Sequence, residues 1–461
     1  MTPQETVERA LALSKADGCV VIATEHSETN LRWANNTLTT NGAMRSRRIA
    51  AISVVDGTTG VAAGVVQRSA VTADGLEDLV RLSEQAAREA GPADDAAPLV
   101  EPYEAADEWD VPAAETSIGV FSEFAPALGE AFQRADGEGR LLFGFAEHAL
   151  ATSYVGSSTG LRRRHVQPTG KVEVNGKSRD FVRSAWTGRS TRDFADVDVA
   201  ELDAELARRL GWAERSIDLP AGRYETLLPP TAVADLTFFV YESASARGAD
   251  EGRTVFSKAG GGSRIGETLS SIPVTLRSDP LEPGLECDPF MLTTGSFGGV
   301  MSVFDNGQPV GPAEWIQDGV LNELIRTRAW AERTHATPRP YVDNLVLEGP
   351  SGGRSLDEMI AATDRGVLVT TLWYIRDVDP QTLLLTGLTR DGIYLVEGGE
   401  VSGAVNNFRW NDSPVDMLGR LTEVGRTERC LPREWNDFFT RTAMPALRVQ
   451  DFNMSTVSQA S

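Results

Sequence analysis

One stretch of the sequence limits how the chain can be divided into folded units. From Glu89 to Gln133 there is no Lys or Arg, while the same 45 residues contain eleven acids. The part from about residue 89 to 116 is also rich in Pro and Ala, a composition that disfavours compact packing. We therefore expect a solvated, linker-like segment there, with a docking site for a basic partner as the alternative reading.

The overall charge argues against nucleic acid and anionic membrane as partners. The 461 residues include 44 Lys+Arg and 66 Asp+Glu, a net charge of −22, and such a surface is repelled by phosphate backbones and anionic bilayers. Half of this charge lies in the acidic stretch, so it is no evidence for mimicry of DNA. With no long apolar run and no signal-peptide pattern, we expect a cytoplasmic protein.

The apolar patterns predict an α+β fold in two parts. Residues 1–218 are expected to form an N-terminal domain of α/β type with mostly antiparallel strands, interrupted by the linker-like segment at about 89–116. Short apolar runs dominate after the turn-forming sequence Asp218–Gly222. Residues 219–461 are therefore expected to form a β-rich C-terminal domain.

Several helices can be placed from the spacing of apolar residues. The stretches 72–90 and 198–215 are amphipathic, and the second begins with the capping-box spacing of Asp198 and Glu201. Further helices are expected at 231–246 and 312–332.

Histidine and cysteine are too sparse for a self-contained zinc site. The four histidines are His26, His148, His165 and His335, and none has another within ten residues. Zinc hydrolases usually take two His from one turn of a helix. The three cysteines form no CxxC pair, which fits a reducing compartment. A Gly-x-Ser-x-Gly match at 156–160 lacks the following helix that a nucleophile elbow requires, so it predicts a turn.

Short segments after residue 250 occur in the same order as the segments of one protein family. They are Glu251–Ser257, Ser302–Gly307, Trp315–Leu321, Asp343–Glu348, Arg365–Thr370, Thr386–Gly392, Asn407–Pro414 and Met444–Val449. With these segments in place, the chain resembles the TldD/PmbA (TldE) family, whose members are also described as peptidases or as modulators of DNA gyrase. The resemblance implies the fold of that family.

The resemblance also indicates which of the two types of family member this chain is like. TldD-type members carry an HExxxH helix and a C-terminal Cys that together bind zinc, and TldE/PmbA-type members lack the motif and pair with a TldD-type chain. Here the corresponding helix, Ala232–Glu242, contains no His. Thr237 and Glu242 lie near the two family His positions, and Cys430 lies near the family Cys. Neither Thr nor Glu replaces a neutral imidazole.

The resemblance therefore implies a non-catalytic TldE/PmbA-like subunit of a heterodimeric zinc metallopeptidase complex that degrades or matures peptides. The partner would be a TldD-type HExxxH subunit that holds the Zn²⁺, with no cofactor in this chain, and the substrate would be an unfolded or short peptide. The alternatives are a stand-alone binding or scaffold homodimer of the gyrase-modulator type and, more remotely, a metal-free hydrolase.

Polar residues in the family-like segments are candidates for lining a substrate chamber or an interface. They are Arg253, Asn344, Arg390, Asn407 and Arg409. We expect no catalytic residue and no metal ligand among them. The alternative for each is structural, with Asn in turns and Arg bridging carboxylates.

Overall fold

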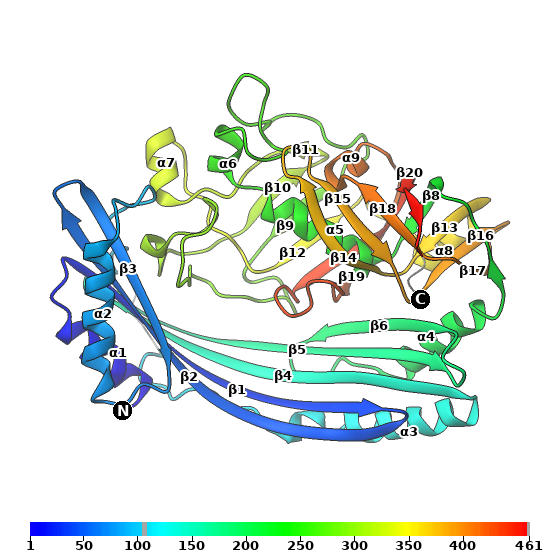
Figure 1. Ribbon diagram of the computed structural model, residues 1–461, viewed down its shortest axis with the longest axis horizontal. Helices are drawn as coiled ribbons and strands as arrows, with labels where there is room; N and C mark the ends of the chain where they lie inside the picture. Colours follow the sequence, from blue (N-terminus) through cyan, green and yellow to red (C-terminus); the bar gives the residue numbers. More distant parts are fainter. Residues whose placement is uncertain (104–107, 459–461) are drawn as a thin grey trace.

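The computed structural model describes residues 1–103 and 108–458. Figure 1 shows a long, curved antiparallel sheet from the N-terminal half, with the C-terminal half lying over its concave face. The α+β class predicted from the sequence is confirmed, because helices and mostly antiparallel strands occur in both halves. None of the helices in the described residues combines the length and apolar character needed to cross a bilayer.

The N-terminal region contains one six-stranded sheet in the order β3-β2-β1-β4-β5-β6. Its elements are α1 (Pro3–Leu13), β1 (Gly18–Ala34), β2 (Thr37–Gly57), β3 (Gly60–Ser69), α2 (Gly75–Glu89), the 3₁₀ turn η1 (Ile118–Phe121), α3 (Phe124–Gly137), β4 (Arg140–Ser157), β5 (Arg162–Ser178), β6 (Ser184–Thr191) and α4 (Val199–Trp212). The β1–β2 hairpin closes with a turn at Asn35 and Asn36, both of which have positive φ.

The helices cover only one face of this sheet. Alternate residues of β1, such as Val21 and Leu31, point toward them. α1 and α2 pack at one end of the sheet, and α3 and α4 at the other (Figure 1). The opposite, concave face meets the C-terminal region, where Val20 and Ile22 pack against Phe290 and Phe304.

The acidic segment is irregular, as its composition suggests, but it is held against the fold. Its described residues between 90 and 117 form neither helix nor strand, and residues 104–107 lie outside the described part. The main-chain carbonyls of Val100 and Val111 accept hydrogen bonds of 2.7 and 2.6 Å from Thr159 and Tyr154. Pro98 accepts one of 2.7 Å from an arginine of the C-terminal region. The segment is thus a packed strap rather than a free linker.

The C-terminal region is built around an eleven-stranded mixed sheet and a separate sheet in the order β14-β15-β18-β21. Its elements are β7 (Ser216–Ile217), β8 (Gly222–Leu228), α5 (Pro230–Glu242), α6 (Ala246–Asp250), β9 (Thr275–Ser278), the 3₁₀ turn η2 (Val303–Asp305), β10 (Ala313–Gln317), β11 (Val320–Leu321), α7 (Arg328–Thr334), β12 (Leu345–Glu348), α8 (Leu356–Ala361), β13 (Arg365–Val369), β14 (Leu372–Asp379), β15 (Leu384–Thr389), β16 (Ile393–Glu397), β17 (Glu400–Val405), β18 (Phe408–Asp412), α9 (Pro414–Leu418), β19 (Leu421–Cys430), β20 (Thr442–Met454) and β21 (Thr456–Val457).

The expected helix at 312–332 is wrong. The chain forms the strands β10 and β11 there, and only α7 near the end is helical. Asp318 and Gly319 both have positive φ and close a tight turn that pairs Gln317 with Val320. An Asp-Gly turn is a hairpin signal, and it overrides the helical spacing of the apolar residues around it.

Candidate functional site

The helix α5 lies at the centre of the C-terminal region and corresponds to the helix that would carry a zinc motif. It is apolar around most of its circumference and is buried accordingly. Thr237 donates its hydroxyl to the Val233 carbonyl of its own helix at 2.7 Å. Glu242, the last residue of the helix, bonds to Tyr341, and burial raises the pKa of its carboxyl. Neither of the two positions near the expected ligands therefore presents an imidazole or a free donor toward a metal.

Asp235 is the one acid inside α5, and it is fully buried. Burial raises the pKa of this carboxyl well above its usual range, although backbone N–H groups of Arg433 and Glu434 oppose the shift. One oxygen accepts the Glu434 N–H at 2.8 Å, and Oδ2 has no partner among the described residues. Asp235 is therefore a buried carboxyl of raised pKa that anchors the loop after β19.

Cys430 ends β19 and begins that loop. Its thiol contacts the Pro230 carbonyl at 3.5 Å and the Thr442 hydroxyl at 3.3 Å. Burial raises the pKa of the Cys430 thiol to about 12. A protonated, buried thiol is neither a nucleophile nor a metal ligand, because both roles need the thiolate.

The loop between β19 and β20, residues 431–441, lies between α5 and the N-terminal sheet and contacts both. Trp435 packs against Phe238 and Phe239 of α5, with ring centroids 4.6 and 5.1 Å apart. Glu434 accepts the N–H groups of Tyr374 and Ile375 at 2.9 and 3.0 Å, and so fixes β14 beside the loop. Several large side chains near the loop remain solvent-exposed, Phe438 by 77% and Tyr374 by 53%.

Arg433 connects this loop to both halves of the molecule. Its buried guanidinium bonds to Asp391 and, at 3.0 Å, to the Thr371 hydroxyl. It also stacks on Trp186 of β6 and Trp373 of β14, at 5.3 and 5.1 Å from their ring centroids. A planar cation that stacks and bonds at once holds three elements in one geometry.

The concave face of the N-terminal sheet supplies charged groups opposite the loop. Lys171 of β5 bonds to Asn436 at 2.9 Å and to Asp437. Burial raises the pKa of Glu173, and burial together with the nearby Glu28 carboxylate raises the pKa of Glu147. The loop and the sheet therefore face each other across a polar, largely acidic surface.

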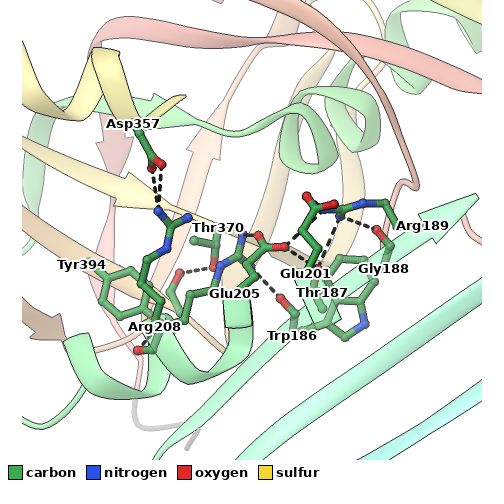
Figure 2. A network of polar contacts seen from close by, with 12 residues as sticks. Trp186, Thr187, Gly188, Arg189, Glu201, Glu205, Arg208, Asp357, Thr370 and Tyr394 are labelled. Atoms are coloured by element: carbon green, nitrogen blue, oxygen red, sulfur yellow. Dashed lines mark hydrogen bonds and ion pairs between the residues drawn. The ribbon is translucent and has the colours of Figure 1, made fainter. Parts of the chain in front are cut away.

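A cleft of about 570 Å³ opens on the other side of Cys430, between β6, α4, α8 and β19. Figure 2 shows its polar network: Arg189 reaches Glu201 and Glu205 at 3.3 and 3.4 Å. Arg208 contacts Asp357 of α8 at 2.8 Å and so ties the two regions together. The arginines drawn there are paired with carboxylates, so the network works as a junction rather than as a ready anion site.

The residues that the sequence nominated do not converge on one site. Asn344 is fully buried, and its amide bonds to the main chain of Asp279 and Leu285, which is a structural role. Arg253 lies on a separate cleft of about 450 Å³, where it pairs with Glu251.

The other three nominated residues gather near the shared end of β15 and β18. Arg409 pairs in register with Leu388 and bonds to Thr386 at 3.3 Å, and Asn407 accepts from the Thr389 hydroxyl. Arg390 is half-exposed, and its Nε lies 3.7 Å from Oδ2 of the neighbouring Asp391. A role for any of the five in a chamber or interface stays a prediction.

Sequence reasoning missed the residues that organise the centre. Asp235 gave a signal, because it is the single acid within an apolar helical run, and such a residue is buried only with partners. The run from Arg433 to Asp437, directly after Cys430, gave a second one, since it combines charges with a tryptophan.

The donor set around α5 does not fit a zinc ion. Within residues 1–103 and 108–458, no three His, Cys, Asp or Glu side chains are grouped so that they could hold a metal. The donors beside it are the Asp235 carboxyl, whose pKa is raised, and the protonated Cys430 thiol, both already engaged in hydrogen bonds. Zinc sites need ionised thiolate or neutral imidazole ligands.

Comparison with solved structures finds the same fold over nearly the whole chain. TldE from Thermococcus kodakarensis superposes with a TM-score of 0.78 and 16% identity, covering 98% of this chain and 99% of that one. A proposed modulator of DNA gyrase from Thermotoga maritima gives 0.76 and 18%, with 98% and 99% coverage. A further proposed gyrase modulator, from Bacteroides thetaiotaomicron, gives 0.75 and 14%, with 99% and 98% coverage.

Sequence comparison defines the class. The profile of the PmbA/TldA metallopeptidase C-terminal domain matches residues 221–456, just over half of the chain. No curated protein matches the sequence. The chain therefore belongs to the PmbA/TldD family, and the resemblance drawn from the ordered segments is confirmed at that level.

Proposed function

We propose that this chain is the non-catalytic, TldE/PmbA-like subunit of a heterodimeric zinc metallopeptidase complex in the cytoplasm. The observation that carries the proposal is the centre of the family domain. The helix α5 has no histidine, burial raises the pKa of its Asp235 carboxyl, and the thiol of Cys430 is held at a pKa of about 12. Water activation by a metal therefore falls to a TldD-type HExxxH partner.

The rest of the fold supports a role in enclosing peptides. The concave sheet carries the carboxylates of Glu147 and Glu173, and Phe438 of the loop 431–441 and Tyr374 of β14 are exposed aromatic rings. Such surfaces suit extended or unfolded peptides, whose side chains and backbone are both accessible, better than folded proteins. In this proposal the chain limits which peptides reach the zinc of its partner.

The test is reconstitution with the TldD-type homologue from the same genome. Zinc is measured by plasma mass spectrometry, and cleavage of an unfolded peptide is followed by mass spectrometry. We expect less than one zinc per ten molecules of this chain alone, no cleavage by either chain alone, and cleavage by the mixture. The matched control is the mixture with a partner whose HExxxH histidines are changed to Ala.

Two outcomes contradict the proposal. Stoichiometric zinc with peptidase activity in the isolated chain makes it an enzyme in its own right. A mixture that neither associates nor gains activity, while this chain forms a stable dimer with itself, favours the scaffold homodimer.

A further inference from the structure

The strand β2 has an unpaired edge along about half of its length. β2 pairs with β1 from Thr37 to Val54, whereas β3 pairs with β2 only from Arg48 onward. Residues 37–47 therefore have β1 on one side and no strand of the described residues on the other. In Figure 1 this half of β2 runs along the outer side of the N-terminal sheet, toward the β1–β2 turn.

The direction of the free backbone groups follows from one hydrogen bond. Ala70 donates its N–H to the Arg47 carbonyl at 3.0 Å, so the backbone of Arg47 points away from β1. The register with β1 is continuous up to Arg32, so the direction alternates every second residue. Asn41, Ala43 and Arg45 therefore turn their N–H and C=O groups toward the open side.

From Thr40 to Arg47 this edge has no feature that blocks pairing with another strand. Exposed edges are usually shielded by Pro, by Lys or by bulges. Residues 37–47 contain neither Pro nor Lys, and the register shift against β1 lies at the start of the stretch, at Thr39. Two arginines occur there, but Arg45 forms two bonds of 2.7 and 2.5 Å with Glu115 and Arg47 pairs with Glu25. Their charges are neutralised within the chain and do not repel a second edge.

The two outer strands of the same sheet give the contrast. β3 is covered by the acidic strap, where Ala93 donates to the Val61 carbonyl at 2.8 Å. β6 is covered by the C-terminal region, where Ser190 donates to the Cys430 carbonyl at 3.2 Å. Only the Thr37–Arg47 stretch of β2, among the described strands of this sheet, combines a long free edge with exposed aliphatic side chains, Leu38 and Met44.

We propose that this edge pairs antiparallel with the equivalent edge of the TldD-type partner, so that the N-terminal sheets of the two subunits become continuous. The inference rests on the proposed function. Members of one family share the fold, so the partner carries the same strand, and two-fold pairing of like edges closes a dimer. If Ala43 pairs with the equivalent residue of the partner strand, Arg45 lies opposite the partner position equivalent to Asn41. The arginines of the two strands therefore do not meet.

The test exploits the outward N–H of Ala43. Ala43→Pro removes a hydrogen bond donor that β1 does not use, so the β1–β2 pairing survives. Ala43→Ser keeps the donor and changes the side chain, which makes it the matched control. We expect Ala43→Pro to weaken association with the partner at least tenfold by calorimetry, while Ala43→Ser binds like the unchanged chain and all three keep the same circular dichroism and melting temperature.

Hydrogen exchange on the unchanged complex gives an independent reading, should Ala43→Pro fail to fold. The amides of Asn41, Ala43 and Arg45 should exchange fast in the isolated chain and slowly in the complex. Equal binding by the Pro variant, or amides that stay unprotected in a formed complex, overturns the edge pairing and leaves the proposed function intact. No association of the unchanged chain with the partner defeats the proposed function itself.

Discussion

The N-terminal and C-terminal sheets differ in how far apart along the chain their neighbouring strands lie. In the N-terminal sheet, hairpins join β1 to β2, β2 to β3, β4 to β5 and β5 to β6. In the eleven-stranded sheet, β8 lies between β20 and β13, and β12 pairs in parallel with β20. The first sheet can form from local contacts, whereas the second needs contacts across more than two hundred residues.

The chemistry follows the same division. The N-terminal sheet is regular and provides a smooth concave wall. The buried groups around α5, Asp235, Cys430 and Arg433, belong to the C-terminal region, at places where distant segments meet. Buried charges of the N-terminal region, such as Arg140 and Asp203, pair with each other. The regular half therefore provides the frame, and the half with long-range pairing holds the groups that set the geometry of the site.

The strongest test of this division removes the residue that joins the two halves. We expect Arg433→Ala to lower the free energy of unfolding by about 3–5 kcal/mol, because it leaves the Asp391 carboxylate buried without its partner. Arg390→Ala is the control, since it removes a half-exposed arginine 3.7 Å from the same carboxylate. That change should cost about 0.2–1 kcal/mol. Urea unfolding measures both, and equal midpoints would contradict the role of Arg433 as a joint.

A substitution that creates a cavity in the N-terminal region tests whether the two halves unfold together. Leu206 of α4 is fully buried against the sheet, and Leu206→Ala should cost about 2–5 kcal/mol. If the junctions through Arg433 and Arg208 couple the halves, circular dichroism and tryptophan fluorescence will report one common, shifted transition. Two separated transitions would show that the halves are independent. The exposed Leu82→Ala is the control and should change stability by less than about 0.5 kcal/mol.

A smaller, pH-dependent effect is expected at Asp235. Burial raises the pKa of this carboxyl in the folded chain, so ionisation opposes folding. The unchanged protein therefore loses stability as the pH rises from about 4 toward the raised pKa, since the folded state binds the extra proton. Asp235→Asn cannot ionise and should gain melting temperature relative to the unchanged chain between pH 5 and pH 8. Parallel pH profiles for the two proteins would contradict a raised pKa of Asp235 in the folded chain.

The smallest effect on stability is expected at Arg253. Its side chain is 53% exposed and pairs with Glu251, so Arg253→Ala should change the free energy of unfolding by less than about 1 kcal/mol. If Arg253 contacts substrate or partner, the kcat/KM of the reconstituted complex will change nonetheless. An exposed arginine far from that cleft, as in Arg179→Ala, serves as the control. Unchanged kinetics would remove Arg253 from the candidates.

Much of the N-terminal region could be predicted from the sequence, because the signals for its helices and strands are local. Asp198 caps α4 through bonds of 2.8 and 3.1 Å to the N–H groups of Ala200 and Glu201, as the spacing predicted. The amphipathic stretch at 72–90 forms α2. The short apolar runs at 19–23 and 30–34 both belong to one strand, β1, because the polar residues between them also pair on both sides.

The candidate site around α5 was harder to predict, because its residues come together only when the chain folds. The family pattern led to α5 and Cys430, yet nothing in the spacing showed that Asp235 bonds to Glu434, 199 positions away. Asn344 was nominated for its place in a family-like segment, and its amide instead closes loops in the core. A pattern of residues along the chain carries no information on which polar groups will be satisfied by distant main chain.

The acidic strap has a consequence for how this protein can change over time. Several carbonyl oxygens of the strap, which any residue provides, hold it in place, as at Pro98, Val100 and Val111. Side chains such as Glu115, which pairs with Arg45, are tied to the fold, whereas acids outside such ion pairs can vary without loss of the fold. A version with several of these acids replaced by Gln or Ser should keep its shape while its isoelectric point moves toward neutrality.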